Sequence, residues 1–286
     1  MSTPLLSATG LMLRYGAHGP PVFSGVDISI QPREIVALLG ESGCGKSSLL
    51  SVLAGLGHAD GGEVLFRGRP VRRTPSQVAV VFQDPCLLPW LSVSANARFG
   101  LGFRNLRLPR SERRTRVSRV LADVGLDGWE KAYPHQLSGG MAQRLALARA
   151  LGRHPSLILL DEPFSALDAL TREAMQDLLT RLVHQHASAA FLVTHDIDEA
   201  LRVADRILLM GGSPAQIMGE WHLLDSLGPP PRRRHGAAAL QLRETILQAL
   251  GHHRCRGGTG LVRHPAPRIN TTTDTRLTVN IQESTA

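Results

Sequence analysis

The segment Gly40-Glu41-Ser42-Gly43-Cys44-Gly45-Lys46-Ser47 has residue types and spacing suited to holding phosphate groups, because it fits the pattern G-x-x-x-x-G-K-[ST]. It follows the apolar run Ile35–Leu39, so an apolar strand, a glycine-rich loop and a helix are expected in that order, the context that this pattern needs. The glycines let successive backbone N–H groups turn toward phosphate oxygens, and the helix that begins near Lys46 adds its positive end. Lys46 is expected to hold the β- and γ-phosphates, and Ser47 to ligate Mg²⁺.

Polar residues end four apolar, β-rich runs of the chain. These are Val36–Leu39 before the glycine-rich loop, Val78–Phe82 before Gln83, Leu157–Leu160 before Asp161-Glu162, and Phe191–Thr194 before His195. Continuous apolar runs separated by helical stretches are typical of a parallel sheet covered on both faces. Parallel sheets bind ligands beyond the carboxyl ends of their strands, so these polar residues are expected to face the nucleotide together.

The chemistry expected at these strand ends is phosphate hydrolysis. Asp161 is expected to hold Mg²⁺, directly or through water, and Glu162 to orient and deprotonate the water that attacks the γ-phosphate. Gln83 is expected to contact the Mg²⁺ shell and that water, the alternative being a polar strand cap. His195 is one of twelve histidines, and its position at a fourth polar strand end is what favours a functional role.

A second glycine-rich helix start follows Leu137, in Ser138-Gly139-Gly140. Ser138 is a good N-cap, which explains the serine in purely structural terms. Two glycines in the first turn are not needed for capping and cost about 1 kcal/mol each in helix stability. They are explained if a ligand must approach the backbone closely, and the positive helix end would suit a γ-phosphate.

Composition indicates an ordinary globular protein with one large α/β core or two closely joined subdomains: 286 residues, 43% hydrophobic and 4% aromatic. The net charge is +8, and part of it comes from the arginines between Arg104 and Arg119, which alternate with apolar residues as on an amphipathic helix. This cluster is interpreted as a solvated face, with contact to a membrane partner or lipid headgroups, or to nucleic acid, as alternatives. No aromatic platform accompanies it, which weakens the nucleic-acid interpretation.

Several classes of protein are excluded by what the chain lacks. Its three cysteines are far apart and have no metal-ligand spacing, so neither a disulfide framework nor a zinc site is expected. No apolar run approaches the roughly 20 residues of a spanning helix, and the N-terminus lacks the pattern of a signal peptide. The protein is therefore expected to stay in the cytoplasm.

The chain resembles the nucleotide-binding subunit of ATP-binding cassette (ABC) transporters over about residues 11–210. The resemblance lies in motifs that occur in the family's order, namely Gly40–Ser47, Gln83, Leu137–Arg144, Leu157–Glu162, Ser165–Asp168 and His195. It implies an ATPase that works as a head-to-tail homodimer, with two ATP molecules between one protomer's phosphate loop and the other's Ser138-Gly139-Gly140. It also implies that Tyr15 stacks on adenine, that Asp168 lies in the loop that crosses the dimer interface, and that Ser48 contributes to the nucleotide site.

Within that family, three segments resemble importers of nitrate, aliphatic sulfonates and taurine. They are Gln83–Trp90, Asp161–Arg172 and Thr194–Ala200. The resemblance implies transmembrane permease subunits as partners, an extracytoplasmic solute-binding protein as an indirect partner, and a place on the cytoplasmic face of the plasma membrane. The alternatives are an ATPase for another small solute, an exporter, or a soluble relative that acts on nucleic acid or ribosomes. A single glycine-rich loop and the absence of a heptad run argue against the last of these.

The expected fold is α/β: a P-loop NTPase (RecA-like) core with an N-terminal antiparallel β subdomain and an inserted α-helical subdomain. The ATPase domain is expected over residues 1–212, with the helical subdomain at about 86–156. A short C-terminal extension is expected over residues 213–250, with a final helix near Leu240–Leu250. Residues 251–286 have little apolar content and are expected to form a disordered tail.

Overall fold

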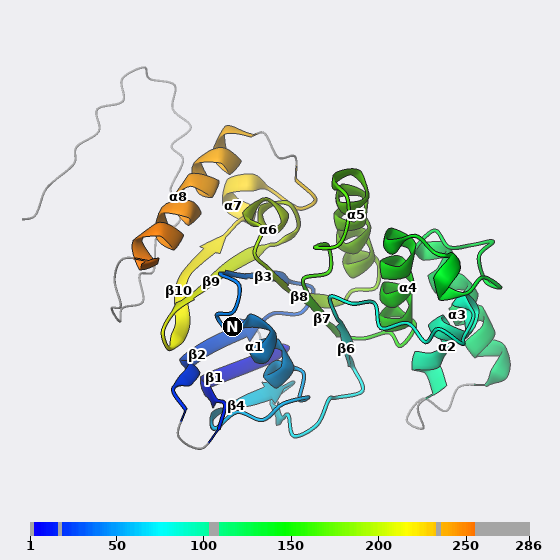
Figure 1. Ribbon diagram of the computed structural model, residues 1–286, viewed down its shortest axis with the longest axis horizontal. Coiled ribbons are helices and arrows are strands. Elements are labelled where there is room, and N and C mark those ends of the chain that lie inside the picture. Colours follow the sequence, from blue (N-terminus) through cyan, green and yellow to red (C-terminus); the bar gives the residue numbers. More distant parts are fainter. Residues whose placement is uncertain (1–2, 17–18, 103–108, 233–235, 255–286) are drawn as a thin grey trace, which may run out of the picture.

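A computed structural model of the chain describes residues 3–16, 19–102, 109–232 and 236–254. Ten strands of these residues form one curled sheet, in the order β5-β4-β1-β2-β10-β9-β3-β8-β7-β6 (Figure 1). The expected fold class, an α/β P-loop core with an antiparallel β part and inserted helices, is confirmed.

The four strands that end on polar residues are parallel neighbours, as predicted. They are β3 (Ile35–Gly40), β8 (Ala189–Thr194), β7 (Leu157–Asp161) and β6 (Val78–Val81). Their carboxyl ends therefore lie along one edge of the sheet.

The rest of the sheet is mostly antiparallel and extends it beyond β3. Its strands are β1 (Leu6–Arg14), β2 (Pro21–Ile30), β4 (Gly61–Phe66), β5 (Arg69–Pro70), β9 (Arg206–Gly212) and β10 (Ala215–His222). The strand β9 continues the parallel region beside β3, and β10 returns antiparallel to it and also pairs with β2. Thus β10, within the expected extension 213–250, is an inner strand of the central sheet, because the β9–β10 hairpin joins its two parts.

Both faces of the parallel strands are buried, which explains their unbroken apolar sequence. In β3, Val36 and Leu38 belong to the cluster that contains α1 (Lys46–Leu53), whereas Ile35, Ala37 and Leu39 belong to the cluster on the other face. That second face is covered by α5 (Ala169–Gln185), α6 (Ile197–Val203) and α8 (Ala237–Arg254).

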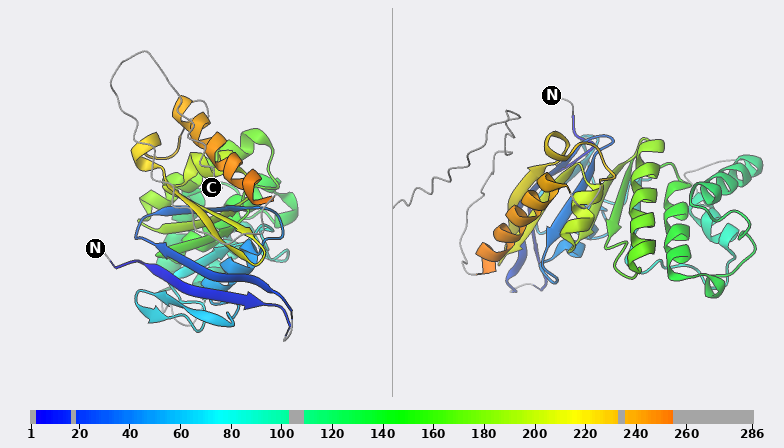
Figure 2. Two further views of the ribbon diagram at one scale, coloured as in Figure 1. Left: turned by 90° about the vertical axis from the view of Figure 1, so that its left-hand side faces the viewer. Right: turned by 90° about the horizontal axis from the view of Figure 1, so that it is seen from above.

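Helices inserted between β6 and β7 form a separate part at one end of the molecule (Figure 2). They are α2 (Val93–Phe99), α3 (Arg110–Asp123) and α4 (Gly139–Leu151), with single 3-10 turns at Gly100–Gly102 and Pro134–Gln136. The helix α2 packs against both α3 and α4. In α3 the apolar residues of the arginine-rich segment, Val117, Val120 and Leu121, are buried, as the amphipathic pattern predicted.

The C-terminal part of the described chain packs on α6. It contains α7 (Leu224–Leu227) and α8, which runs on through Gly251 to Arg254, past the limit expected for the final helix. The remainder of the expected tail, residues 255–286, lies outside the described residues. Among the helices described, none is long and apolar enough to cross a membrane.

Candidate functional site

The glycine-rich loop joins β3 to α1, as its sequence predicted. The Nζ atom of Lys46 is buried and donates hydrogen bonds to the carbonyl oxygens of Gly40 (2.9 Å) and Glu41 (2.8 Å). Gly43 and Gly45 have φ values of +83° and +99°, in the left-handed region that favours glycine. The ammonium group is therefore held by the loop's own carbonyl groups, beside the backbone that would surround a phosphate.

Two further residues of the expected nucleotide site meet beside this loop. The hydroxyl groups of Tyr15 and Ser48 are 2.8 Å apart, within hydrogen-bond distance. Tyr15 is 67% exposed, an unusual position for a large aromatic side chain. An exposed ring fixed at its hydroxyl end is available for stacking on a flat ligand.

Ser47, in the first turn of α1, and Asp161, the last residue of β7, lie in direct contact. Ser47 Oγ donates a hydrogen bond to Asp161 Oδ1 (3.0 Å). Burial raises the pKa of the Asp161 carboxyl, the neighbouring Glu162 adds to this, and the hydrogen bond from Ser47 and the charge of Lys46 oppose it. A hydroxyl and a carboxylate side by side are the oxygen donors that Mg²⁺ prefers, so the residues present fit this ion.

Glu162 and His195 also meet at this edge, because β7 and β8 are neighbours. Glu162 Oε1 lies 3.2 Å from His195 Nδ1. The backbone of Glu162 has φ = +43°, an uncommon conformation for a residue with a side chain, and its N–H donates to the Val193 carbonyl (2.9 Å). Such local backbone strain is concentrated at functional sites, where surrounding contacts hold it in place.

Gln83 joins the same group through a residue that the sequence analysis did not single out. Its Nε2 donates to Ser165 Oγ (3.2 Å), and that hydroxyl donates to the carbonyl oxygen of Glu162 (2.9 Å). The loop after Gln83 is held by Arg149, which donates to the carbonyl oxygens of Pro85 (2.8 Å) and Cys86 (2.7 Å). Ser165 lies within a segment that carried the family resemblance, but only the fold shows what it contacts.

The second glycine element is the N-terminus of α4, as predicted. Ser138 Oγ accepts a hydrogen bond from the backbone N–H of Met141 (3.3 Å). A Cβ atom on Gly139 would meet nothing within 4 Å, whereas one on Gly140 would lie 2.5 Å from Thr171 Cγ2 in α5. Packing inside the chain thus accounts for Gly140, while Gly139 is open.

This helix tip does not join the phosphate loop of the same chain. Figure 1 shows α4 in the inserted helical part and α1 beside the antiparallel strands, well apart in the view. The structure therefore brings together Lys46, Ser47, Asp161, Glu162 and His195, and leaves Ser138-Gly139-Gly140 elsewhere.

Asp168 is the N-cap of α5 and is exposed. Its carboxylate accepts hydrogen bonds from the backbone N–H (3.0 Å) and the hydroxyl (2.6 Å) of Thr171. These hydrogen bonds lower the pKa of the Asp168 carboxyl. It is fixed as a carboxylate on the surface between β7 and α5.

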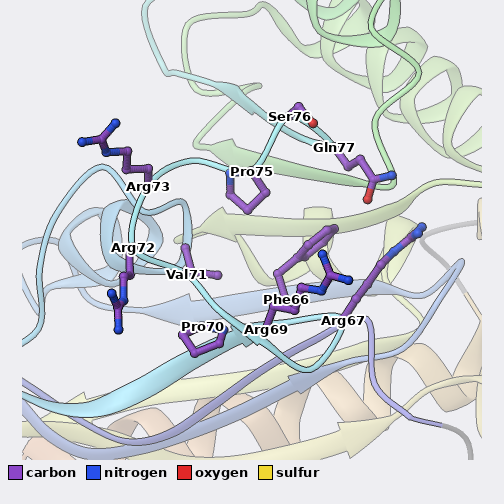
Figure 3. A pocket seen from close by; sticks show the side chains of 10 residues that line it. All are labelled: Phe66, Arg67, Arg69, Pro70, Val71, Arg72, Arg73, Pro75, Ser76 and Gln77. Atoms are coloured by element: carbon purple, nitrogen blue, oxygen red, sulfur yellow. The ribbon is translucent and has the colours of Figure 1, made fainter. Parts of the chain in front are cut away.

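A pocket of about 730 Å³ lies away from the cluster of Lys46, Ser47, Asp161, Glu162 and His195. Figure 3 shows its lining between Phe66 and Gln77, at the amino end of β6, whereas Gln83 follows the carboxyl end of that strand. Arg69 and Pro70 form the edge strand β5 there, and a charge and a proline at an edge oppose pairing with another chain. We assign this pocket no part in the nucleotide site.

The chain is similar in sequence to known proteins. Residues 23–165 match the family model described as ABC transporter. An aliphatic sulfonates import ATP-binding protein of Xanthomonas axonopodis pv. citri is 46% identical over 250 residues, which cover 86% of this chain and 98% of that protein. A taurine import ATP-binding protein of Chromobacterium violaceum is 44% identical, with 80% of this chain and 85% of that protein covered.

Solved structures give the same result for the fold. The protein cbiO1 from Clostridium perfringens, part of an ABC transporter complex, superposes with a TM-score of 0.72 at 25% identity and covers 88% of this chain and 98% of its own. A dimeric ATP-binding cassette in a post-hydrolysis state, bound to ADP and Pi, gives 0.67 at 29% identity and covers 76% of this chain and 98% of its own. By sequence and by fold, this chain belongs to the ABC transporter family.

Proposed function

We propose that this chain is the ATP-hydrolysing subunit of an importer for a small anionic solute, an aliphatic sulfonate, taurine or nitrate. The observation that carries the proposal is the division of the phosphate-binding elements between two places. Lys46, Ser47, Asp161, Glu162 and His195 share one sheet edge, while the open Gly139 lies on a distant helix tip. The relatives that act on sulfonates and taurine support the solute class.

In this proposal Lys46 moves from its loop carbonyls to the β- and γ-phosphates of ATP, and the backbone of residues 40–47 surrounds them. Tyr15 stacks on the adenine and Ser48 keeps its ring in place. Ser47, Asp161 and Gln83 are the residues that would hold Mg²⁺, which neutralises charge on the phosphates.

Glu162 is the proposed general base. Its carboxylate orients the attacking water and removes its proton, with its backbone fixed by Val193 and Ser165. His195, beside it, contacts the γ-phosphate and stabilises the charge that develops there. Gln83 contacts the attacking water and is connected to the backbone of Glu162 by the hydrogen bonds of Ser165.

The nucleotide site is completed by a second copy of the chain in a head-to-tail dimer. The partner's copy of the α4 tip donates backbone N–H groups to the γ-phosphate, with Asp168 at the interface. A few charge-assisted hydrogen bonds of about 1.5–3 kcal/mol each reach the roughly 5.5 kcal/mol that turns a 1:99 open-to-closed population into 99:1. ADP lacks this bridge, so hydrolysis reopens the dimer.

Transmembrane permease subunits are the proposed mechanical partners, at the cytoplasmic face of the plasma membrane. The surface after Gln83 is suited to docking them, since Trp90 there is 70% exposed and the loop is anchored by Arg149. Closure of the dimer moves two such surfaces together, and a solute-binding protein acts on the far side of the permease.

A mixing experiment tests the composite site. Lys46→Ala disables the phosphate loop and keeps the α4 tip, whereas Ser138→Arg does the reverse. Each variant alone is expected to lose ATP hydrolysis. Their mixture contains dimers with one intact composite site, so hydrolysis should reappear. A mixture as inactive as its components contradicts the composite site.

An assay of solute-stimulated ATP hydrolysis tests the proposed solute class. The subunit and its permease are reconstituted in vesicles with the solute-binding protein, and ATP hydrolysis is measured with aliphatic sulfonates, taurine and nitrate in turn. One of the three is expected to stimulate hydrolysis, and stimulation by none of them contradicts the solute class.

A further inference from the structure

Both neighbours of His195 are tied into a network with α6, the helix that begins after it. Thr194, the last residue of β8, donates from Oγ1 to the buried carboxylate of Glu199 (2.7 Å) and accepts from the backbone N–H of Asp196 (3.0 Å). Asp196 caps α6 by accepting from the N–H groups of Asp198 (2.8 Å) and Glu199 (3.2 Å). The position of His195 is therefore set by the two carboxylates of Asp196 and Glu199.

Arg172, on α5, lies against both of these carboxylates. Its Nη1 is 3.8 Å from Asp196 Oδ2 and its Nε is 3.6 Å from Glu199 Oε1. Burial raises the pKa of the Glu199 carboxyl, and the nearby Asp196 adds to this, while the hydrogen bond from Thr194 and the charge of Arg172 act in the opposite direction. The guanidinium thus places a positive charge beside this buried carboxylate.

The other edge of the same guanidinium reaches the loop of Asp168. Arg172 Nη2 donates a hydrogen bond to the carbonyl oxygen of Leu167 (3.0 Å), the residue directly before Asp168. One planar side chain thus contacts the residue before Asp168 and the residue after His195. The rigid fork of an arginine suits such a bridge, because its donors are fixed relative to one another.

We propose that Arg172 is a positioning residue that couples the loop of Asp168 to the loop of His195. The proposal rests on the function proposed above, in which Asp168 lies at the dimer interface and His195 contacts the γ-phosphate. When the partner protomer shifts Asp168, the Leu167 carbonyl moves Arg172, and Arg172 moves the Asp196–Glu199 pair that sets His195. Formation of the complete dimer thereby changes the position of His195 through contacts that do not involve the nucleotide.

Arg172→Lys is the main test, because a lysine keeps the positive charge beside Glu199 but cannot bridge both loops with one ammonium. In the purified full-length chain we expect kcat for ATP hydrolysis to fall about tenfold, the scale of a small misplacement of a reacting group, with the Kd for ATP within about twofold. Arg172→Ala should lose at least as much.

Arg202→Ala is the matched control. Arg202 also joins α6 to α5, through an ion pair with Asp177 (2.8 Å), but among the described residues its side chain makes no hydrogen bond to either loop. It should hydrolyse ATP at the parent rate. A parental kcat in Arg172→Lys overturns the coupling, because the positive charge alone would then be sufficient. An equal loss of kcat in Arg202→Ala also overturns it, because any contact between α5 and α6 would then have the same effect.

A double-mutant cycle with His195→Ala separates this proposal from the proposed function. If Arg172 acts through His195, Arg172→Lys adds less than twofold in the His195→Ala background, measured with radiolabelled ATP to reach low rates. A full tenfold loss in that background overturns the coupling and leaves the ATPase assignment intact. Parental hydrolysis by His195→Ala itself overturns the coupling and the role proposed for His195, and leaves the ATPase assignment intact.

Hydrogen exchange gives a readout that does not depend on activity. The backbone amides of residues 194–199 are expected to exchange faster in Arg172→Lys than in Arg202→Ala, with Mg-ATP present. Equal exchange in the two variants contradicts the proposal.

Discussion

Glu162 Oε1 lies 3.2 Å from His195 Nδ1, although the two residues follow different strands. The contact exists because β7 and β8 pair in parallel and end together. A carboxylate next to an imidazole at the end of a phosphate-binding edge is suited to moving a proton from water during phosphate transfer.

Replacing Glu162 by Gln is therefore expected to separate binding from hydrolysis. The amide keeps the size of the side chain but cannot accept the proton, so kcat should fall by about 10²-fold or more, while ATP binding is retained. The variant should form a stable dimer with Mg-ATP, measured by size-exclusion chromatography with light scattering. Hydrolysis at the parent rate contradicts the assignment of Glu162 as the base.

The two glycines of the α4 tip are expected to respond differently to alanine. Gly139→Ala meets nothing within the chain and should gain up to about 1 kcal/mol of helix stability, yet weaken the dimer that forms with Mg-ATP. Gly140→Ala places a Cβ 2.5 Å from Thr171 and should lower the melting temperature of the monomer. Melting curves without ATP and light scattering with ATP distinguish the two effects. If Gly139→Ala forms the dimer with Mg-ATP as well as the parent does, the proposal that a ligand must approach the backbone of Gly139 closely is contradicted.

Arg232 is expected to contribute to stability rather than to catalysis. Its buried guanidinium donates to the carbonyl oxygens of Gly228 (2.6 Å), Leu201 (3.2 Å) and Ala204 (2.5 Å), and burial lowers its pKa to about 10. Arg232→Ala leaves these carbonyls, two at the end of α6 and one directly after α7, without their donor and should cost about 1–3 kcal/mol. The melting temperature should fall by about 2–4 °C per kcal/mol.

Exposed Arg181 provides the control for this prediction, and Arg181→Ala should melt within 1 °C or so of the parent, since surface changes are usually near neutral. Equal melting of the two variants shows that Arg232 is not needed to hold the C-terminal part on α6.

Glu199 is expected to give stability a particular dependence on pH. Its pKa is raised in the folded state, chiefly by burial, so the folded protein binds the proton before the unfolded chain does. The contribution of Glu199 to stability is present below the unfolded value of about 4.3 and is lost as pH rises through the folded value. The melting temperature of the parent relative to Glu199→Gln should therefore improve as pH falls from about 7.5 toward the unfolded value. A difference that is constant over this range contradicts the prediction.

Local sequence alone determined the parts of the site that depend on neighbouring residues. The phosphate loop, the four polar strand ends and the capped α4 tip were predictable because glycine spacing, apolar runs and an N-cap serine act within a few residues of one another. Their chemistry could also be assigned, since a lysine, a serine and paired carboxylates have few other uses at such places.

The tertiary structure decided which of these ends meet. The order β3-β8-β7-β6 differs from the order along the chain, so the contact of Glu162 with His195 depends on β8 lying between β3 and β7. The same holds for the contact of Ser165 with Gln83, for the contact of Thr171 with Gly140 and for the position of Arg172 between two loops. These contacts join residues from separate strands and helices, and only the packing of the sheet and its helices brings them together.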